Sequence, residues 1–278
     1  MKNILVPCDF SKPAIDAFRF ALDMASLSSG TVHLVNVIEL PAMPNTALTP
    51  VRALGLPLRK EMSANAERNF EKIRAKYKSE NANVVSAVEF GVPAKGILAY
   101  AKKNSIDTII MGSHGATGVK EMFVGSNTEK IVRTSPIPVI VVKEFYKGAV
   151  KDIVFAWAYE CEGQAALIKE LKNLQTFFGS TLHLVWINTP ANFTIDATTL
   201  RRLEAFAKSN KLKNYTISTF NDLYEEQGII EFANSINADM IAMGTHGRRG
   251  LSRMVYGSKT ENIANHGKDL LWTYVMKN

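Results

Sequence analysis

A glycine-rich segment occurs twice in this chain of 278 residues, and a constant displacement separates the two copies. The first copy is Gly112-Ser113-His114-Gly115, followed after nine residues by Gly125-Ser126; the second is Gly244-Thr245-His246-Gly247, followed after nine residues by Gly257-Ser258. All matching positions differ by 132 residues, and the segments directly before the glycines align at the same displacement. The chain is therefore predicted to be a tandem duplication.

The displacement is larger upstream of the glycines. Thr31–Val35 aligns with Thr181–Val185 at 150 residues, so the first copy holds 18 extra residues, which is the difference between the two displacements. The segment Leu40–Leu58 carries four prolines: Pro41, Pro44, Pro50 and Pro57. That density is typical of a long loop, so we predict that the insertion lies there and forms a lid or a partner-binding loop.

Apolar runs and helical spacings alternate along the first half. The expected strands are Asn3–Pro7, Thr31–Ile38, Val84–Glu89, Asp107–Gly112 and Ile137–Val142. Four helices are expected between them: one that begins after the N-cap Ser11, one over about Leu58–Lys78, one over Ala94–Asn104 and one that begins near Gly125. Strands separated by helices predict an α/β fold, with a doubly wound parallel sheet in each half and ligands at the carboxyl ends of the strands.

Composition excludes several classes of protein. The net charge of +7 comes from 33 basic and 26 acidic residues spread over both halves, which does not indicate nucleic-acid binding. No apolar run reaches the roughly 18 residues that a membrane span needs, and the N-terminus has no signal-peptide pattern. Cys8 and Cys161 lie in different halves without metal-ligand spacing, which suits a reducing compartment. We expect a cytoplasmic protein.

The glycine-rich segment has the chemistry of a phosphate site. Gly112 and Gly115 let main-chain N–H groups approach a ligand, and the helix that begins near Gly125 offers unpaired N–H groups to an anion. A strand-loop-helix turn also needs glycine for structural reasons, but its repetition favours a ligand. The segment matches neither the Walker A loop nor the Rossmann fingerprint.

The pattern resembles the ATP-binding members of the universal stress protein family, in which Gly-x-x-Gly is followed by nine residues and Gly-[Ser/Thr]. The resemblance covers essentially the whole chain, including the first strand ending at Asp9, the segment Met111–Gly115 and the segment Ser135–Val139. It implies two domains, 1–145 and 150–278, each with a five-stranded parallel sheet, that pair through their last strands. It also implies ATP, or a related adenine nucleotide, with Mg²⁺ carried on the phosphates.

The resemblance also implies which residues bind the nucleotide. On the adenine or ribose side we expect Asp9, with Pro7 and Ser11 nearby, and the main chain of Val37. Along the ribose and phosphates we expect Met111, Gly112, His114 and Gly115, and on the phosphates Gly125, Ser126, Asn127 and Thr128. One wall is expected to be Gly91–Pro93. No catalytic residue or metal ligand is assigned, because His114 and His246 have no ligand-spaced partner and are expected to pack or hydrogen-bond.

The second half keeps the glycines but changes their surroundings. Asp9 corresponds to Ala158, Ser11 to Glu160 and Cys8 to Trp157. The set Gly244, Gly247, Gly257 and Ser258 is therefore a weaker candidate site, which we expect to be modified or vacant. Trp157, Trp186 and Trp272 all belong to this half and are expected in a core or an interface.

Three functions remain open on the sequence. The first is a stress-response or signalling module that binds ATP with negligible turnover, and the second is a slow ATPase or autophosphorylating protein that uses Ser126 or Thr128. The third is an interaction scaffold that binds no nucleotide. Pairing of two chains as a homodimer is compatible with each of them.

Overall fold

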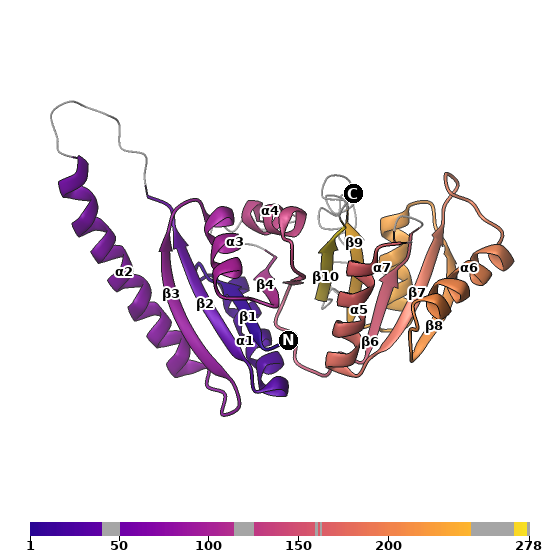
Figure 1. The fold of residues 1–278 in the computed structure, drawn as a ribbon, viewed down its shortest axis with the longest axis horizontal. Coiled ribbons are helices and arrows are strands. Elements are labelled where there is room, and N and C mark those ends of the chain that lie inside the picture. The colour runs from indigo at the N-terminus through magenta and orange to yellow at the C-terminus, as the bar shows by residue number, and fades with distance from the viewer. Residues whose placement is uncertain (41–50, 114–124, 159–160, 162, 246–269, 277–278) are drawn as a thin grey trace.

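The computed structural model describes residues 1–40, 51–113, 125–158, 161, 163–245 and 270–276 (Figure 1). The first half contains β1 (Asn3–Pro7), α1 (Lys12–Ser28), β2 (Thr31–Ile38), α2 (Val51–Lys76), β3 (Asn83–Phe90), α3 (Pro93–Lys103), β4 (Thr108–Gly112), α4 (Ser126–Thr134) and β5 (Val139–Val142). The second half contains β6 (Asp152–Ala156), α5 (Ala165–Phe178), β7 (Thr181–Asn188), α6 (Asp196–Ser209), β8 (Tyr215–Asn221), α7 (Glu225–Ser235), β9 (Met240–Thr245) and β10 (Leu270–Val275).

The strands form one ten-stranded sheet in the order β3-β2-β1-β4-β5-β10-β9-β6-β7-β8. Pairing is parallel within each half, but β5 and β10 meet antiparallel, with Leu270 opposite Val142 and Thr273 opposite Val139. Each half is therefore a five-stranded parallel sheet, and the two join through their last strands. The predicted tandem doubly wound fold is confirmed.

Helices cover both faces of the sheet (Figure 1). Alternate strand residues such as Ile4, Leu34 and Phe155 pack with α1, α2, α5 and α6 on one face. The intervening residues, such as Leu5 and Val35, pack with α3, α4 and α7 on the other. Burial on both faces explains why the inner strands read as apolar runs. Within the described part of the chain, no helix has the length and apolarity to cross a membrane.

The start of α1 follows its sequence signals. Ser11 is the N-cap and its hydroxyl accepts the N–H of Ala14 at 3.4 Å, while proline occupies the first turn. The predicted apolar stripe is buried, with Phe18 and Ala21 fully so. Ser29 ends the helix in the left-handed conformation. These features fix the path of the chain as it leaves β1, where the candidate site begins.

The boundary predicted for α2 was wrong. We expected the helix to begin at Leu58, after the proline-rich loop, but it begins at Val51 and contains Pro57. Proline usually marks a helix start because it lacks the N–H that an interior residue donates. In α2, residues 51–56 are helical as well, so Pro57 lies within the helix and not at its start. The rest of the predicted lid, 41–50, lies outside the described residues.

The strand ends nearest the junction of the two halves are shorter than predicted. β5 begins at Val139 and not at Ile137, and β4 begins at Thr108 and not at Asp107. β5 ends at Val142 and β6 begins at Asp152. The division into domains 1–145 and 150–278 stays a prediction.

Candidate functional site

A cavity of about 340 Å³ opens at the carboxyl ends of β1, β2 and β4, beside the start of α4. The chain winds from β1 to β2 and β3 on one side and returns to β4 on the other side of β1. Such a reversal of strand order leaves a crevice at the carboxyl edge of a doubly wound sheet. The residues that line the cavity are Pro7, Cys8, Asp9, Ala14, Val35, Asn36, Val37, Pro93, Ile97, Met111, Gly112, Gly125, Ser126, Asn127 and Thr128.

The turn after β1 holds the carboxylate of Asp9 in place. Its Oδ1 accepts hydrogen bonds from the Ser11 N–H at 3.1 Å and from the Ser11 hydroxyl at 2.5 Å. Between them, Phe10 adopts a positive φ of 67°, which is uncommon for a residue with a side chain. Its ring packs against Phe70 of α2, with the centroids 5.2 Å apart. The contact with Phe70, which is 60 residues away in the sequence, therefore supports the backbone conformation that presents Asp9 to the cavity.

The end of β2 is fastened to the end of β1. The Cys8 N–H donates to the Val35 carbonyl at 2.8 Å, and the Asn36 amide donates to the Cys8 carbonyl at 2.7 Å. Val37 lies against α3, where a Cβ added to Gly96 would come within 2.7 Å of its side chain. This close approach places Ile97 beside Val37 and forms an apolar wall of the cavity.

The other end of the cavity is the N-terminus of α4. Gly125 is the N-cap, and as a glycine it has no side chain that could accept a hydrogen bond from the first N–H groups of the helix. The first N–H groups of a helix have no partner within the helix, and the helix dipole favours an anion there. The Thr128 hydroxyl donates to the Gly112 carbonyl at 3.0 Å and so joins α4 to β4. Thr128 therefore has its main-chain N–H, and not its hydroxyl, to offer to a ligand.

Gly112 is required where β4 meets α1. A Cβ at this position would lie 2.5 Å from the carbonyl carbon of Pro13, which is a backbone atom that cannot move aside cheaply. The glycine therefore permits close packing of the strand end against the first turn of the helix.

The cavity brings together most of the residues that the sequence predicted. Pro7, Asp9, Val37, Met111, Gly112 and Gly125, Ser126, Asn127 and Thr128 all line it, as does Pro93 of the predicted wall. Ser11 does not line the cavity but holds Asp9 through its two hydrogen bonds. His114 and Gly115 lie outside the described residues. The roles of these residues toward a ligand stay predictions.

Several lining residues were not predicted as contacts: Cys8, Ala14, Val35, Asn36 and Ile97. Asn36 gave a usable signal, because it is an amide between two valines in an otherwise apolar strand end. Burial raises the pKa of the Cys8 thiol to about 12, so the side chain is neutral at physiological pH. It contributes apolar surface to the cavity and no charge.

The corresponding place in the second half is filled differently. The main-chain N–H of Trp157 donates to the Val185 carbonyl at 3.0 Å, as the main-chain N–H of Cys8 does to the Val35 carbonyl, so Trp157 stands in the position of Cys8. Trp186 stands in the position of Asn36, and the two buried indoles lie 5.7 Å apart at 61°. Two large rings thus replace a thiol and an amide. Their burial, with that of Trp272, confirms the prediction that the tryptophans are core residues.

The glycines of the second half are only partly described. Gly244 lies in β9, and a Cβ there would meet the side chains of Leu167 at 2.8 Å and Met276 at 2.9 Å. Gly247, Gly257 and Ser258 lie outside the described residues. The loss of the Asp9 carboxylate at Ala158 and the indole pair both separate this region from the first-half cavity.

Two five-stranded parallel halves, with a cavity at the strand reversal of the first half, define a doubly wound α/β protein of the kind that binds ligands at the edge of its sheet. The profile of the universal stress protein family matches residues 1–143 and 223–268, more than half of the chain. The chain belongs to the universal stress protein family.

Similar proteins include both single-length and double-length members. Universal stress protein MJ0577 of Methanocaldococcus jannaschii is 31% identical over 153 residues, which cover 51% of this chain and 94% of the relative. Universal stress protein Slr1230 of Synechocystis is 23% identical, and the match covers 95% of this chain and 96% of the relative. The crystal structure of a universal stress protein from Archaeoglobus fulgidus has a TM-score of 0.69 at 19% identity and covers 99% of this chain and 97% of its own. The two full-length matches support the tandem arrangement.

Proposed function

We propose that the first half of the chain binds an adenine nucleotide such as ATP and that the protein acts as a stress-response or signalling module. One observation carries the proposal. A single cavity joins the carboxylate of Asp9, an apolar wall and the open N-terminus of α4. Its volume of about 340 Å³ lies within the roughly 300–1,000 Å³ that small-molecule sites occupy.

Each part of the cavity suits one part of a nucleotide. The Asp9 carboxylate accepts hydrogen bonds, as ribose hydroxyls require, and the apolar side chains of Val37 and Ile97 suit the base. The N–H groups at the start of α4 suit phosphate oxygens. Among the described lining residues, Asp9 is the one carboxylate. Mg²⁺ would therefore be held chiefly by phosphate oxygens and water, and would supply charge neutralisation.

Binding without appreciable turnover fits these contacts better than hydrolysis. The Thr128 hydroxyl donates a hydrogen bond to the Gly112 carbonyl, and the Asp9 carboxylate accepts one from the Ser11 hydroxyl. We assign neither group as a general base. We therefore expect nucleotide occupancy, and not catalysis, to be the signal, and we expect Ser126→Ala to leave any residual turnover unchanged.

The second half is expected to bind no nucleotide through equivalent contacts. Ala158 supplies no carboxylate, and Trp157 and Trp186 occupy the positions of two cavity residues. We propose one nucleotide per chain. The buried, unbridged thiols of Cys8 and Cys161 suit a reducing compartment, so we place the protein in the cytoplasm. Homodimer formation and the absence of nucleic-acid binding belong to the same proposal.

Calorimetric titration with Mg-ATP tests the proposal. We expect one site per chain and at least a tenfold loss of affinity in Asp9→Ala, equivalent to about 1.4 kcal/mol. Asp222→Ala is the matched control, because the Asp222 carboxylate also accepts an N–H two residues on, from Tyr224 at 3.1 Å, but lies in the second half. Two sites per chain, or equal loss in both variants, would contradict the proposal.

A further inference from the structure

The end of β2 contributes a side-chain oxygen to the candidate site. Asn36 lies between Val35 and Val37, lines the cavity and is half-buried. Its Nδ2 donates to the Cys8 carbonyl at 2.7 Å, whereas its Oδ1 accepts no hydrogen bond from the described residues. That oxygen is not sealed in the core, since it is not one of the fully buried unpaired atoms of the described chain. A ligand in the cavity can therefore reach it.

The end of β2 also faces a gap in the sheet. β1 pairs with β2 only as far as Pro7 opposite Val35, whereas residues 36–38 of β2 continue alongside β3. On the side of β1, these last residues of β2 have no strand beside them in the described part of the chain. A ligand ring in this gap lies beside Asn36 and Val37, which both line the cavity.

The hydrogen bond to Cys8 fixes which way the Asn36 amide points. An asparagine amide can turn over and offer either its NH₂ group or its oxygen, so its surroundings decide its orientation. The Cys8 carbonyl only accepts hydrogen bonds, so the Nδ2 must face it. Turning the amide over would bring two oxygens to the 2.7 Å that now separates donor and acceptor, and would leave the carbonyl unpaired. Asn36 therefore presents an acceptor, and not a donor, to the cavity.

A fixed acceptor distinguishes purines by the group that they carry on carbon 6. Adenine has an amino group there, which donates hydrogen bonds, whereas guanine and hypoxanthine have an oxygen, which accepts them. An oxygen placed against Asn36 Oδ1 leaves two acceptors facing each other. A site built to pair with a donor rejects an analogue that lacks it. The amino group has two hydrogens, so a bond to Asn36 leaves the other for the main chain of Val37.

We propose that Asn36 selects the base of the nucleotide: its Oδ1 accepts a hydrogen bond from the 6-amino group of adenine and disfavours 6-oxopurines. This inference rests on the proposed function of the first half and names the residue that sets the choice of base. The Cys8 carbonyl is the positioning group, because it holds the amide in the orientation that accepts from an amino group. In the second half, Trp186 stands in the position of Asn36 and offers no acceptor, since its indole nitrogen donates to Asn188 Oδ1 at 2.9 Å.

Calorimetric titration of the full chain with three magnesium-bound triphosphates tests the proposal without changing the protein. ATP has the 6-amino group, inosine triphosphate has a 6-oxo group, and purine riboside triphosphate has only hydrogen at that carbon. The ribose and the phosphates are the same in all three. We expect ATP to bind at least tenfold more tightly than inosine triphosphate and at least threefold more tightly than purine riboside triphosphate.

Two variants assign this selectivity to Asn36. Asn36→Leu keeps the approximate size of the side chain but removes the acceptor, so it should lower the preference for ATP over inosine triphosphate to less than threefold. Asn104→Leu is the matched control, because the Asn104 amide also donates to a main-chain carbonyl, that of Tyr100 at 3.0 Å, but does not line the cavity. It should keep the preference of the parent chain.

The possible failures separate the two claims. Equal binding of ATP and inosine triphosphate by the parent chain, or an unchanged preference in Asn36→Leu, overturns the role of Asn36 and leaves nucleotide binding intact. No binding of any of the three, at concentrations up to about 1 mM, overturns the proposed function and this inference with it. Should Asn36→Leu fail to fold, purine riboside triphosphate decides, because binding as tight as that of ATP shows that no group pairs with the amino group.

Discussion

Cys8 connects the candidate site with the stability of the first half. The thiol lines the cavity, is buried, and has its pKa raised from 9.0 to about 12. The unfolded chain loses this proton above about pH 9, whereas the folded chain keeps it until about pH 12. Its contribution to stability is therefore complete below pH 9 and is lost as the pH rises through this window, by about 4 kcal/mol in total.

This pH dependence can be isolated with one variant. Between pH 8 and pH 10.5 we expect the free energy of unfolding of the parent chain to fall by about 2 kcal/mol more than that of Cys8→Ala. Other titrating groups contribute equally to both chains, so the difference between the two urea titrations reports Cys8. Equal slopes against pH would show that the thiol is more accessible to water than the structure indicates.

At the scale of single residues, the sequence predicted those whose role depends on local position. The N-cap Ser11 could be predicted because it stands between a strand and a proline-led helix. Asp9, expected at the ligand site from the family resemblance, lines the cavity, and its role toward a ligand stays a prediction. Asn36 stands out in the sequence as an amide between two valines, but its partner Cys8, 28 residues away in the chain, could not be predicted. Such a partner depends on the pairing of β1 with β2 and is not visible in local spacing.

Among the elements, α2 is the one whose sequence conflicts with its structure. Pro57 lies inside the helix, where proline costs about 3 kcal/mol relative to alanine. We predict that Pro57→Ala slows hydrogen exchange of the backbone amides over residues 51–57 and increases the far-UV helical signal. Pro93→Ala is the control, because Pro93 stands in the first turn of α3, where proline is well tolerated. A similar gain in both variants would contradict the helical path through Pro57.

Most elements could be predicted because the spacing of apolar residues agreed with the capping and turn residues at their ends. β1 and β2 have the bounds expected from their apolar runs, and α1 begins at the expected N-cap. The start of α2 could not be predicted, since the local preference of proline for a helix start was overridden by the residues before it. The junction strand β5 was predicted too long because prolines at 136 and 138 limit its ladder.

Across the whole molecule, the central structural claim is that the halves form one sheet. Trp272 of β10 is fully buried opposite Ile140 of β5. Removing its indole in Trp272→Ala should cost about 3–5 kcal/mol, as truncations of large core residues do. Phe193→Ala is the control, because Phe193 is 73% exposed and its loss should change stability by less than about 0.5 kcal/mol.

The same variants test whether the halves unfold together. All three tryptophans lie in the second half, so their fluorescence reports that half, whereas far-UV circular dichroism reports both. We expect the two signals to change at the same denaturant concentration in the parent chain and to shift together in Trp272→Ala. A dichroism transition in two steps would show that the β5–β10 pair does not couple the halves.

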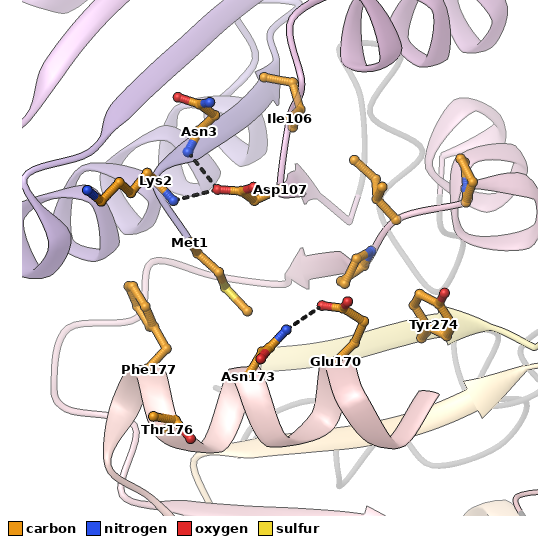
Figure 2. A pocket seen from close by; sticks show the side chains of 13 residues that line it. Met1, Lys2, Asn3, Ile106, Asp107, Glu170, Asn173, Thr176, Phe177 and Tyr274 are labelled. Carbon is orange, nitrogen blue, oxygen red and sulfur yellow. Dashed lines mark hydrogen bonds between the residues drawn. The ribbon is translucent and has the colours of Figure 1, made fainter. Parts of the chain in front are cut away.

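The repeat in the sequence predicted the architecture of each half but not all that follows from their union. Pro136–Pro138 of one half and α5 of the other line the same cavity of about 760 Å³ (Figure 2). No spacing within either copy encodes that approach. The difference between the first-half cavity and the corresponding place in the second half was predictable, by contrast, since Ala158 and Trp157 are direct substitutions at aligned positions.

The most direct test of the account is a crystal structure of the full chain grown with Mg²⁺ and a non-hydrolysable ATP analogue. We predict one nucleotide per chain, with its ribose at Asp9, its base against Val37 and its phosphates at the start of α4. Nucleotide between Trp157 and Trp186 in the second half, or none at Asp9 under saturating conditions, would contradict the assignment of the first half as the nucleotide-binding half.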